Sequence, residues 1–411
     1  MPPPSGWGGK WPMNHEQVMG DTVTHLALVN ARLITDDAVV EGGLVAEDGR
    51  IVSVGPGVVA PAGVEVIDVA GRYLAPGLIE LHVHGGGGFS LLTEDPAEVD
   101  AYARWITSRG VTSFLIGVAG GEHERTLRAL RSSAAFFERP PAGAAEALGY
   151  FLEGPFLNPR RKGAFPEPWL RPPDVQQFHQ YVAATGGRLR LLTFAPELPG
   201  GDALTRAALE SGVVPSMGHT DATYEEALRS FEAGVRHVTH CFNAMRPFAQ
   251  RDPGCLGAAL TAPGVTCELI LDGSHVHPAA AALLVRAKGV DGTVLITDAI
   301  PPAGCEGDAI EWEGMKARVV GKAAVREDGS IIGSVATTDD LVRNAVAWLP
   351  VTLPEALRMV SRNPARVLGL DGRKGSLRPG TDADLVVLDE GLRVVMTLVR
   401  GQVVYQRVDA A

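Results

Sequence analysis

Apolar runs of four to eight residues alternate through the middle of the chain with segments whose apolar residues recur at helical spacing. In one nearly complete unit, VVPSMGH has the pattern of a strand, and Thr223 with Glu226 fits a capping box for the helix TYEEALRSFEA. Gly234 ends that helix, and VRHVTH is the next strand. This βαβ order is typical of a parallel sheet covered by helices. Roughly 300 residues of such units match a (β/α)8 barrel, whose reactive side chains sit at the C-terminal ends of its strands.

The two ends of the chain have a different pattern. From Val23 to about Val69, and again in GSLRPGTDADLVVLDEGLRVVMTLVRGQVVYQ, short β-type runs are broken by turn signals. We expect these ends to pair in one small β domain made of residues 21–75 and 375–411, with the barrel at 76–374. Residues 1–20 show no periodicity and are expected to form a disordered extension. The predicted fold class is α/β.

The composition of the chain restricts the classes of molecule that it can bind. The chain has 411 residues, 45% of them hydrophobic, and a formal net charge of −11, so it offers no basic field for nucleic acid or an anionic membrane. An anionic substrate must therefore meet a local cationic cluster. The four cysteines form no CxxC pair, and no run of 18 apolar residues or signal peptide is present, which predicts a cytoplasmic protein. These cysteines are Cys241, Cys255, Cys267 and Cys305.

Residues that can bind metals recur where the apolar runs stop. YLAPGLIELHVH ends in His82 and His84, which lie two apart and so project to the same face of a strand. The remaining candidates at strand ends are Glu153, His219, His240 and Asp298. A single histidine of this kind is more often a core or surface residue than a metal ligand. Repetition at five successive strand ends instead predicts a metal centre of imidazoles and carboxylates.

Asp298 has two interpretations. It can cap a turn or helix before the following Pro-Pro, or it can act as general base and acid beside a metal-activated water. Coordination lowers the pKa of water from about 15.7 to about 7, which is the chemical reason for a metal at such a site.

Other polar residues near strand ends can contact a substrate. We interpret His275, in LILDGSHVHP, as a substrate contact and His277 as an ordinary loop histidine. The loop FNAMRPFAQRDPG offers Asn243, Arg246 and Arg251, and it is the best local anion site because arginine presents a planar fork to phosphate or carboxylate. The second basic loop is interpreted as a solvated rim; it contains Arg160, Arg161 and Lys162.

Several strings carry a resemblance to a known family. PGLIELHVHGGGG, EGPFLNPRRKGAF, GHTDATYEEA, THCFNAM, LDGSHVHP and LITDA occur in the order seen in the N-acetylglucosamine-6-phosphate deacetylases of the amidohydrolase superfamily, which the chain resembles from about residue 24 to 405. The resemblance implies a (β/α)8 barrel, a β-sandwich built from both chain ends and a divalent metal centre. It also implies a homodimer and hydrolysis of the acetamide of an amino-sugar 6-phosphate.

The same resemblance implies a role for individual residues. Asp298 matches the catalytic aspartate, and Arg251 matches an arginine that meets the phosphate, reaching the neighbouring subunit's site in the dimer. The implied metal ligands are Glu153, His219 and His240, with His82 and His84 matching a pair that only some members keep. The implied substrate contacts are Ala164, Asn243, Ala244, Arg251, His275, Ile332, Gly333 and Ser334. One or two ions of zinc, iron, manganese or cobalt suit these donors equally.

One departure from the family pattern affects the substrate. Where the family usually has KGAH, this chain has KGAF, so Phe165 replaces a histidine that would help to bind the sugar. The expected substrate is N-acetyl-D-glucosamine 6-phosphate. Two alternatives stay open: deacetylation of a related substrate such as N-acetylgalactosamine 6-phosphate, and a non-catalytic scaffold of the same fold.

Overall fold

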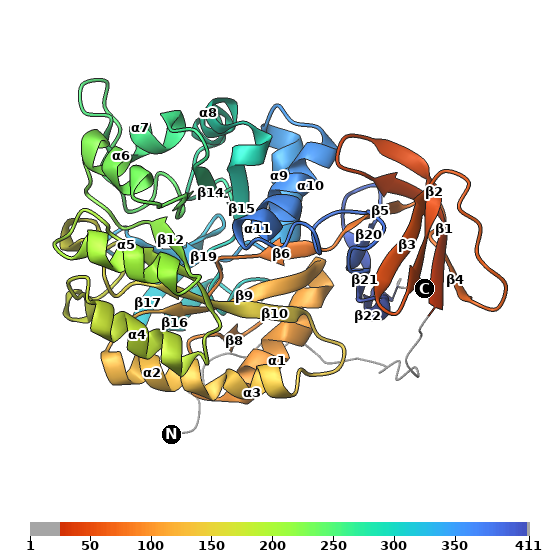
Figure 1. The fold of residues 1–411 in the computed structure, drawn as a ribbon, viewed down its shortest axis with the longest axis horizontal. Helices are drawn as coiled ribbons and strands as arrows, with labels where there is room; N and C mark the ends of the chain where they lie inside the picture. The colour runs from red at the N-terminus through yellow and green to blue at the C-terminus, as the bar shows by residue number, and fades with distance from the viewer. Residues whose placement is uncertain (1–24, 409–411) are drawn as a thin grey trace.

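The structure, a computed structural model, describes residues 25–408, and the extension predicted for residues 1–20 lies outside them. Eight parallel strands form the central sheet, in the spatial order β15-β14-β13-β12-β11-β10-β9-β6 (Figure 1). Their bounds are β6 (Leu78–Glu80), β9 (Val111–Ala119), β10 (Glu146–Glu153), β11 (Leu189–Phe194), β12 (Val214–Met217), β13 (His237–Val238), β14 (Thr266–Ile270) and β15 (Thr293–Ile296).

The sheet closes into a barrel at the C-terminal ends of its first and last strands. An isolated parallel bridge joins Val83 to Ala299 beyond the ends of β6 and β15. The backbone N–H of Asp298 donates to the carbonyl of His82 over 2.9 Å, and that of His84 donates to the carbonyl of Ala299 over 2.7 Å. The closure therefore brings the His82–His84 segment next to Asp298, although more than 200 residues separate them in the sequence.

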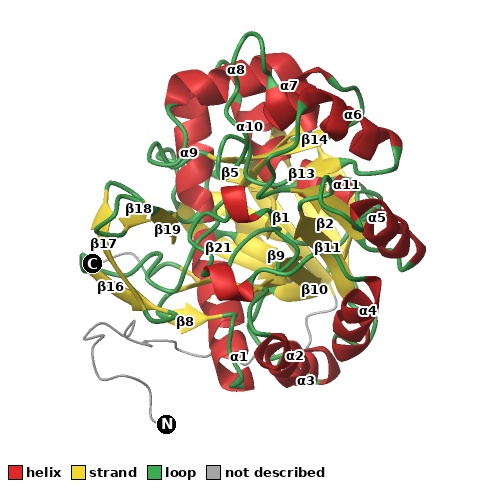
Figure 2. Cartoon of the chain, turned by 90° about the vertical axis from the view of Figure 1, so that its left-hand side faces the viewer, coloured by secondary structure: helices red, strands yellow, loops and turns green. Residues whose placement is uncertain are grey.

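Helices surround the barrel strands (Figure 2). The predicted capping box of Thr223 and Glu226 is confirmed at the start of α6, and Gly234, with a φ of 118°, follows the end of that helix. The α-helices are α1 (Pro96–Trp105), α2 (His123–Ser132), α3 (Ala134–Glu138), α4 (Val175–Ala184), α5 (Gly201–Glu210), α6 (Tyr224–Glu232), α7 (Gly254–Thr261), α8 (Pro278–Lys288), α9 (Thr338–Trp348), α10 (Leu353–Val360) and α11 (Arg362–Val367).

Both ends of the chain meet in a separate eight-stranded sheet, with the order β22-β21-β20-β5-β1-β2-β3 and β4 paired to β1 (Figure 1). Buried residues from both ends share one core, in which Leu28 and Leu33 lie with Leu385 and Leu398. The α/β fold class, with a barrel and a small β domain from both chain ends, is confirmed. The strands are β1 (His25–Ile34), β2 (Val39–Glu47), β3 (Arg50–Gly55), β4 (Glu65–Asp68), β5 (Tyr73–Pro76), β20 (Leu385–Leu388), β21 (Val394–Val399) and β22 (Gln402–Gln406).

A small antiparallel sheet between β15 and α9 was not expected from the sequence. It has the order β16-β17-β18-β19 and lies to one side of the barrel, opposite α4 and α5 (Figure 2). Its strands are β16 (Ala309–Trp312), β17 (Met315–Val320), β18 (Ala323–Val325) and β19 (Ile331–Ser334), and a two-stranded sheet joins β7 (Gly85–Gly86) to β8 (Phe89–Ser90). The N–H of Ser334 donates to the carbonyl of Asp298 over 2.9 Å, which ties this sheet to the barrel mouth.

Candidate functional site

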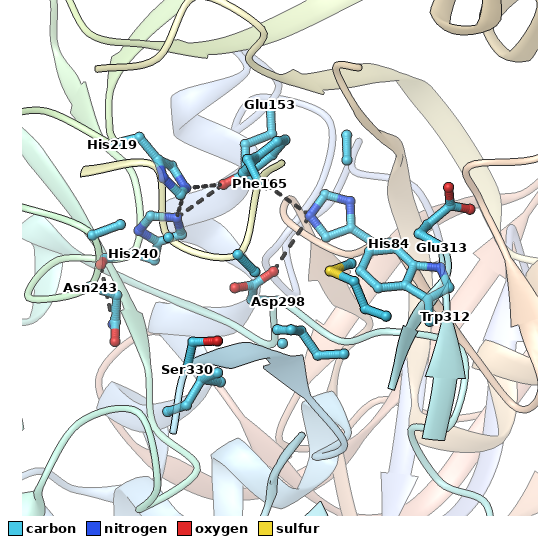
Figure 3. Close-up of a pocket in the computed structure, with 18 of the residues that line it drawn as sticks. His84, Glu153, Phe165, His219, His240, Asn243, Asp298, Trp312, Glu313 and Ser330 are labelled. Atoms are coloured by element: carbon cyan, nitrogen blue, oxygen red, sulfur yellow. Dashed lines mark hydrogen bonds and ion pairs between the residues drawn. The ribbon is translucent and has the colours of Figure 1, made fainter. Parts of the chain in front are cut away.

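The six predicted metal and acid–base residues lie at the C-terminal mouth of the barrel. His82 and His84 follow β6, Glu153 is the last residue of β10, and His219, His240 and Asp298 follow β12, β13 and β15. The four histidines and Glu153 are each at most 5% exposed. Figure 3 shows the side chains of His84, His219 and His240 pointing toward Glu153.

Three of these residues have an unusual backbone conformation. His219, His240 and Asp298 have φ values of 47°, 26° and 51°, in the left-handed region that residues other than glycine rarely adopt. Such strain costs about 1–3 kcal/mol per residue and collects at functional sites. The turn after each strand is therefore held by surrounding structure so that the side chain points into the mouth.

Glu153 is shared between two groups of donor atoms. Its Oε1 lies 3.1 Å from Nε2 of His219 and 3.0 Å from Nε2 of His240. We call these atoms the His219 half of the centre. Its Oε2 lies 3.0 Å from Nε2 of His84 and 3.7 Å from Nε2 of His82.

Asp298 completes the second group, which we call the His82 half. Its Oδ1 lies 3.4 Å from Nε2 of His82 and 3.5 Å from Nε2 of His84. Within each half, the donor atoms all lie within 4.8 Å of one another. The arrangement suits two cations, one in each half, that share the Glu153 carboxylate.

The hydrogen bonds of two histidines fit metal binding. Nδ1 of His219 lies 2.9 Å from the carbonyl oxygen of Arg161, so Nδ1 carries a proton and Nε2 is the nitrogen that can offer a lone pair to a cation. Nδ1 of His82 lies 2.9 Å from the Glu268 carboxylate, with the same consequence. Nε2 of His82 is buried and has no hydrogen-bond partner, as expected for an atom that binds a metal ion.

The histidines of the centre stabilise the ionised form of its two carboxylates. Without a bound cation, burial disfavours the charged form of Glu153, but the charge of protonated His82 and the hydrogen bonds donated by His219 and His240 hold its pKa well below the usual range. A bound ion would take the place of these protons. Burial also acts on Asp298, whose pKa is nevertheless lowered by His82 and His84. Both carboxylates are therefore anionic and available to a cation.

A cavity of about 360 Å³ opens above these residues. Of the predicted substrate contacts, Arg251 and Ser334 do not line it. Arg251 is exposed, and the Ser334 hydroxyl is buried and donates to Asp272 over 2.9 Å. Asp272 in turn lies 2.6 Å from Nδ1 of His275, which leaves Nε2 of His275 for a substrate. The predicted contacts that do line the cavity are Ala164, Asn243, Ala244, His275, Ile332 and Gly333.

The remaining polar residues of the loops pair with neighbours. Nδ1 of His277 accepts from the N–H of Ala279 and caps α8, which agrees with its interpretation as an ordinary loop residue. Arg246 binds Asp252 over 2.7 Å. Arg161 binds Asp221 over 2.7 Å at the rim.

Apart from Phe165, sequence reasoning missed the apolar wall of the cavity and the residues behind the metal candidates. Phe165 packs edge-on against His219 with ring centroids 5.2 Å apart, and the ring of Trp312 lies 6.1 Å from that of His84. Glu268 was detectable, because a carboxylate inside the apolar run CELIL requires a partner when the strand is buried. The other missed residues are Leu92, Trp169, Met315, His237 and Asp272.

The sequence of the chain is similar to sequences of known proteins over most of its length. Residues 73–404 match the amidohydrolase family. The chain is 34% identical over 384 residues to the N-acetylglucosamine-6-phosphate deacetylase of Bacillus subtilis, which covers 92% of this chain and 97% of the relative. It is 35% identical over 383 residues to the N-acetylgalactosamine-6-phosphate deacetylase of Escherichia coli O157:H7, covering 92% and 99%.

The fold also matches solved structures. One is an aspartate-to-alanine mutant of N-acetyl-D-glucosamine-6-phosphate deacetylase from Mycobacterium smegmatis in complex with N-acetyl-D-glucosamine 6-phosphate. It superposes with a TM-score of 0.86 at 31% identity, covering 93% of this chain and 100% of that one.

Proposed function

This chain belongs to the amidohydrolase family and within it to the N-acetylglucosamine-6-phosphate deacetylases, and we propose that it hydrolyses the acetamide of N-acetyl-D-glucosamine 6-phosphate to D-glucosamine 6-phosphate and acetate. The observation that carries the proposal is the pair of donor sets sharing Glu153 next to Asp298. An inert scaffold would not need to keep His219, His240 and Asp298 in strained backbone at the mouth of a cavity.

The donor set fits divalent metal ions, and we propose two of them. His82, His84, Asp298 and one oxygen of Glu153 would hold one ion, and His219, His240 and the other oxygen would hold the second. When bound, divalent ions supply Lewis-acid chemistry, because they polarise a carbonyl and make hydroxide available from water near neutral pH. Histidine and carboxylate donors suit zinc, iron, manganese and cobalt.

Asp298 is placed to move the proton of the reaction. Its carboxylate is anionic, so it can accept the proton released as the water oxygen joins the acetyl carbon. The same carboxyl then donates that proton to the amide nitrogen as the C–N bond breaks, which gives the free amine and acetate. His275, held at Nδ1 by Asp272, presents Nε2 to the substrate from another side of the cavity.

The sugar and its phosphate need further contacts. Asn243 and Ala244 line the cavity next to the His219 half and would face the sugar. We propose that Arg251 of a second copy supplies the phosphate contact in a homodimer, since Arg251 of this copy is exposed and does not line its own cavity. Among the described residues no helix is both long and apolar enough to cross a membrane, and all four cysteines are free thiols, in keeping with the proposed cytoplasmic location.

Because Phe165 stands where the family has a histidine, the first experiment determines which sugar the protein accepts. An apolar ring against His219 cannot replace a histidine hydrogen bond to a sugar hydroxyl. A relative named N-acetylgalactosamine-6-phosphate deacetylase is also as similar to this chain as one named N-acetylglucosamine-6-phosphate deacetylase. Acetate release should be measured from both N-acetylated sugar 6-phosphates, after metal removal and again after reconstitution. We expect the highest kcat/KM for the glucosamine compound. Preference for the galactosamine epimer would favour the alternative substrate, and no acetate release from either compound would exclude the proposal.

Replacing Asp298 tests the mechanism. In Asp298→Asn the amide oxygen can still face the cation, but the side chain cannot accept a proton, so we expect metal content to persist while kcat falls by about 10²–10⁴-fold. Metal analysis and steady-state kinetics on one preparation measure both quantities. Near-normal kcat in this variant would show that Asp298 does not transfer the proton.

A further inference from the structure

A buried carboxylate lies directly behind His82. Glu268 on β14 is 0% exposed, and its Oε2 lies 2.9 Å from Nδ1 of His82, which is itself 0% exposed. The same oxygen accepts the backbone N–H of His240 over 3.1 Å. Glu268 therefore contacts the ring of one candidate metal ligand and the main chain of another.

The Glu268 contact decides which nitrogen of His82 can bind a cation. An ionised carboxylate only accepts hydrogen bonds, so Nδ1 of His82 must carry the proton that it donates to Glu268. Nε2 is then left with a lone pair, and this buried atom faces Glu153 and Asp298 with no hydrogen-bond partner. A carboxylate in this position also makes the imidazole a more basic ligand.

Glu268 is itself held from the other side. Its Oε1 lies 3.0 Å from Nε2 of His237, a buried residue of β13. Nδ1 of His237 lies 2.7 Å from the hydroxyl of Thr266. Both oxygens of Glu268 are thus occupied, and the carboxylate cannot turn away from His82 without breaking two buried hydrogen bonds.

We propose that Glu268 is a positioning residue that sets the metal affinity of the His82 half of the centre. The inference rests on the proposed metal-dependent function. It goes beyond that function by assigning a role to a residue outside the cavity that touches neither the substrate nor the reacting atoms. Removing an outer partner of a metal-binding histidine typically weakens metal affinity about 10–100-fold.

Glu80 provides a matched control. It is 1% exposed and stands two residues before His82, so it is a second buried carboxylate close to this histidine in the chain. Its hydrogen bonds come from the backbone N–H groups of His82 and Thr297, each over 3.3 Å, and from the Thr338 hydroxyl over 2.9 Å. None of these partners is an imidazole ring, so the same substitution at position 80 does not change which nitrogen of His82 carries the proton.

The experiment measures the affinity of both ions by competition with a chelator, using Zn²⁺ added to the metal-free full chain. Glu268→Leu removes the acceptor and is expected to weaken one ion about 100-fold, whereas Glu268→Gln keeps an acceptor oxygen but loses the charge and is expected to weaken it about tenfold. The other ion should lose less affinity than the first in both variants, because Glu268 reaches its ligand His240 only through the backbone N–H. Glu80→Leu and Glu80→Gln should leave both ions unchanged. Thermal unfolding of every variant reports whether it folds.

Each outcome separates the inference from the function on which it rests. Wild-type affinity for both ions in the Glu268 variants would overturn the inference while the proposed function stood. Weakening of metal affinity in the Glu80 variants equal to that in the Glu268 variants would also overturn it, because that result indicates a general loosening of the barrel. If Glu268→Leu does not fold, Glu268→Gln against Glu80→Gln decides by the same criteria. A wild-type protein that binds no ion would overturn the proposed function itself.

Discussion

The two halves of the metal centre use the same residue types but are anchored differently. The His82 half has four donor residues, and its rear partner is the charged carboxylate of Glu268. The His219 half has three donor residues, and His219 is held by a neutral main-chain carbonyl of Arg161. The ring of His82 is thus held by a charged side chain and the ring of His219 by a neutral main-chain oxygen, although Glu268 also accepts the backbone N–H of His240 in the His219 half.

The backbone supports this contrast. His219 and His240 lie in left-handed turns, as does Asp298 of the His82 half, whereas His82 and His84 have ordinary φ values and are fixed by the barrel closure between β6 and β15. Gly218, just before His219, has no room for a side chain, because an added Cβ would lie 2.6 Å from Thr193 and 2.8 Å from Thr239. The turn before His219 therefore depends on close packing, and so does the segment between His82 and His84, where an added Cβ on Gly117 would lie 1.7 Å from the Val83 carbonyl oxygen.

Glu153 is where the two halves meet, and its loss should have the largest effect. Glu153→Ala removes a donor from both halves, so we expect neither ion to stay bound during gel filtration. Since Lewis-acid stabilisation is worth several kcal/mol, kcat/KM should fall by about a thousandfold or more. Glu153→Gln keeps one oxygen and should retain one ion. Full metal content in the alanine variant would show that the halves do not share this carboxylate.

Removing one histidine from each half tests their unequal donor numbers. Catalytic metal sites typically use three protein ligands, so His84→Asn leaves three donor residues beside its ion, whereas His219→Asn leaves only two. We expect His219→Asn to hold a single ion. His84→Asn should still take up two ions at saturating metal, with weakened affinity for one. Metal titration of both variants measures the difference, and equal losses would contradict the asymmetry.

The sequence was sufficient to predict the parts of the protein that repeat. Apolar runs, the Thr223 capping box and polar residues at strand ends follow local rules, so the barrel and the residues around Glu153 could be predicted. The paired β-type patterns at the two chain ends likewise predicted the shared sheet.

Contacts between distant strands could not be predicted in the same way. Glu268 and His82 meet only because barrel closure and register place β14 behind the end of β6. Trp312 and Met315 reach the cavity from the β16–β19 sheet, whose short strands carry no signal of where they dock. Ser334 was expected at the substrate, yet its hydroxyl donates to Asp272 and does not line the cavity, because a sequence match cannot fix the direction of a side chain. Arg251 was expected to reach the site of a neighbouring subunit, and that contact stays a prediction.

The smallest effect is expected for a substitution beside the His219 half, at Thr239. This substitution tests whether packing alone holds the metal ligands of that half in place. The Thr239 hydroxyl lies 2.6 Å from those of both Thr193 and Ser216, and all three are buried. Thr239→Val leaves two buried hydroxyls without this partner and should lower the free energy of unfolding by about 1–3 kcal/mol in urea titration, with both ions retained. Thr205→Val is the control, since its hydroxyl bonds only the Gly201 carbonyl within α5. Loss of an ion from Thr239→Val would mean that the hydroxyls set metal affinity, as the carboxylate of Glu268 is proposed to do in the other half.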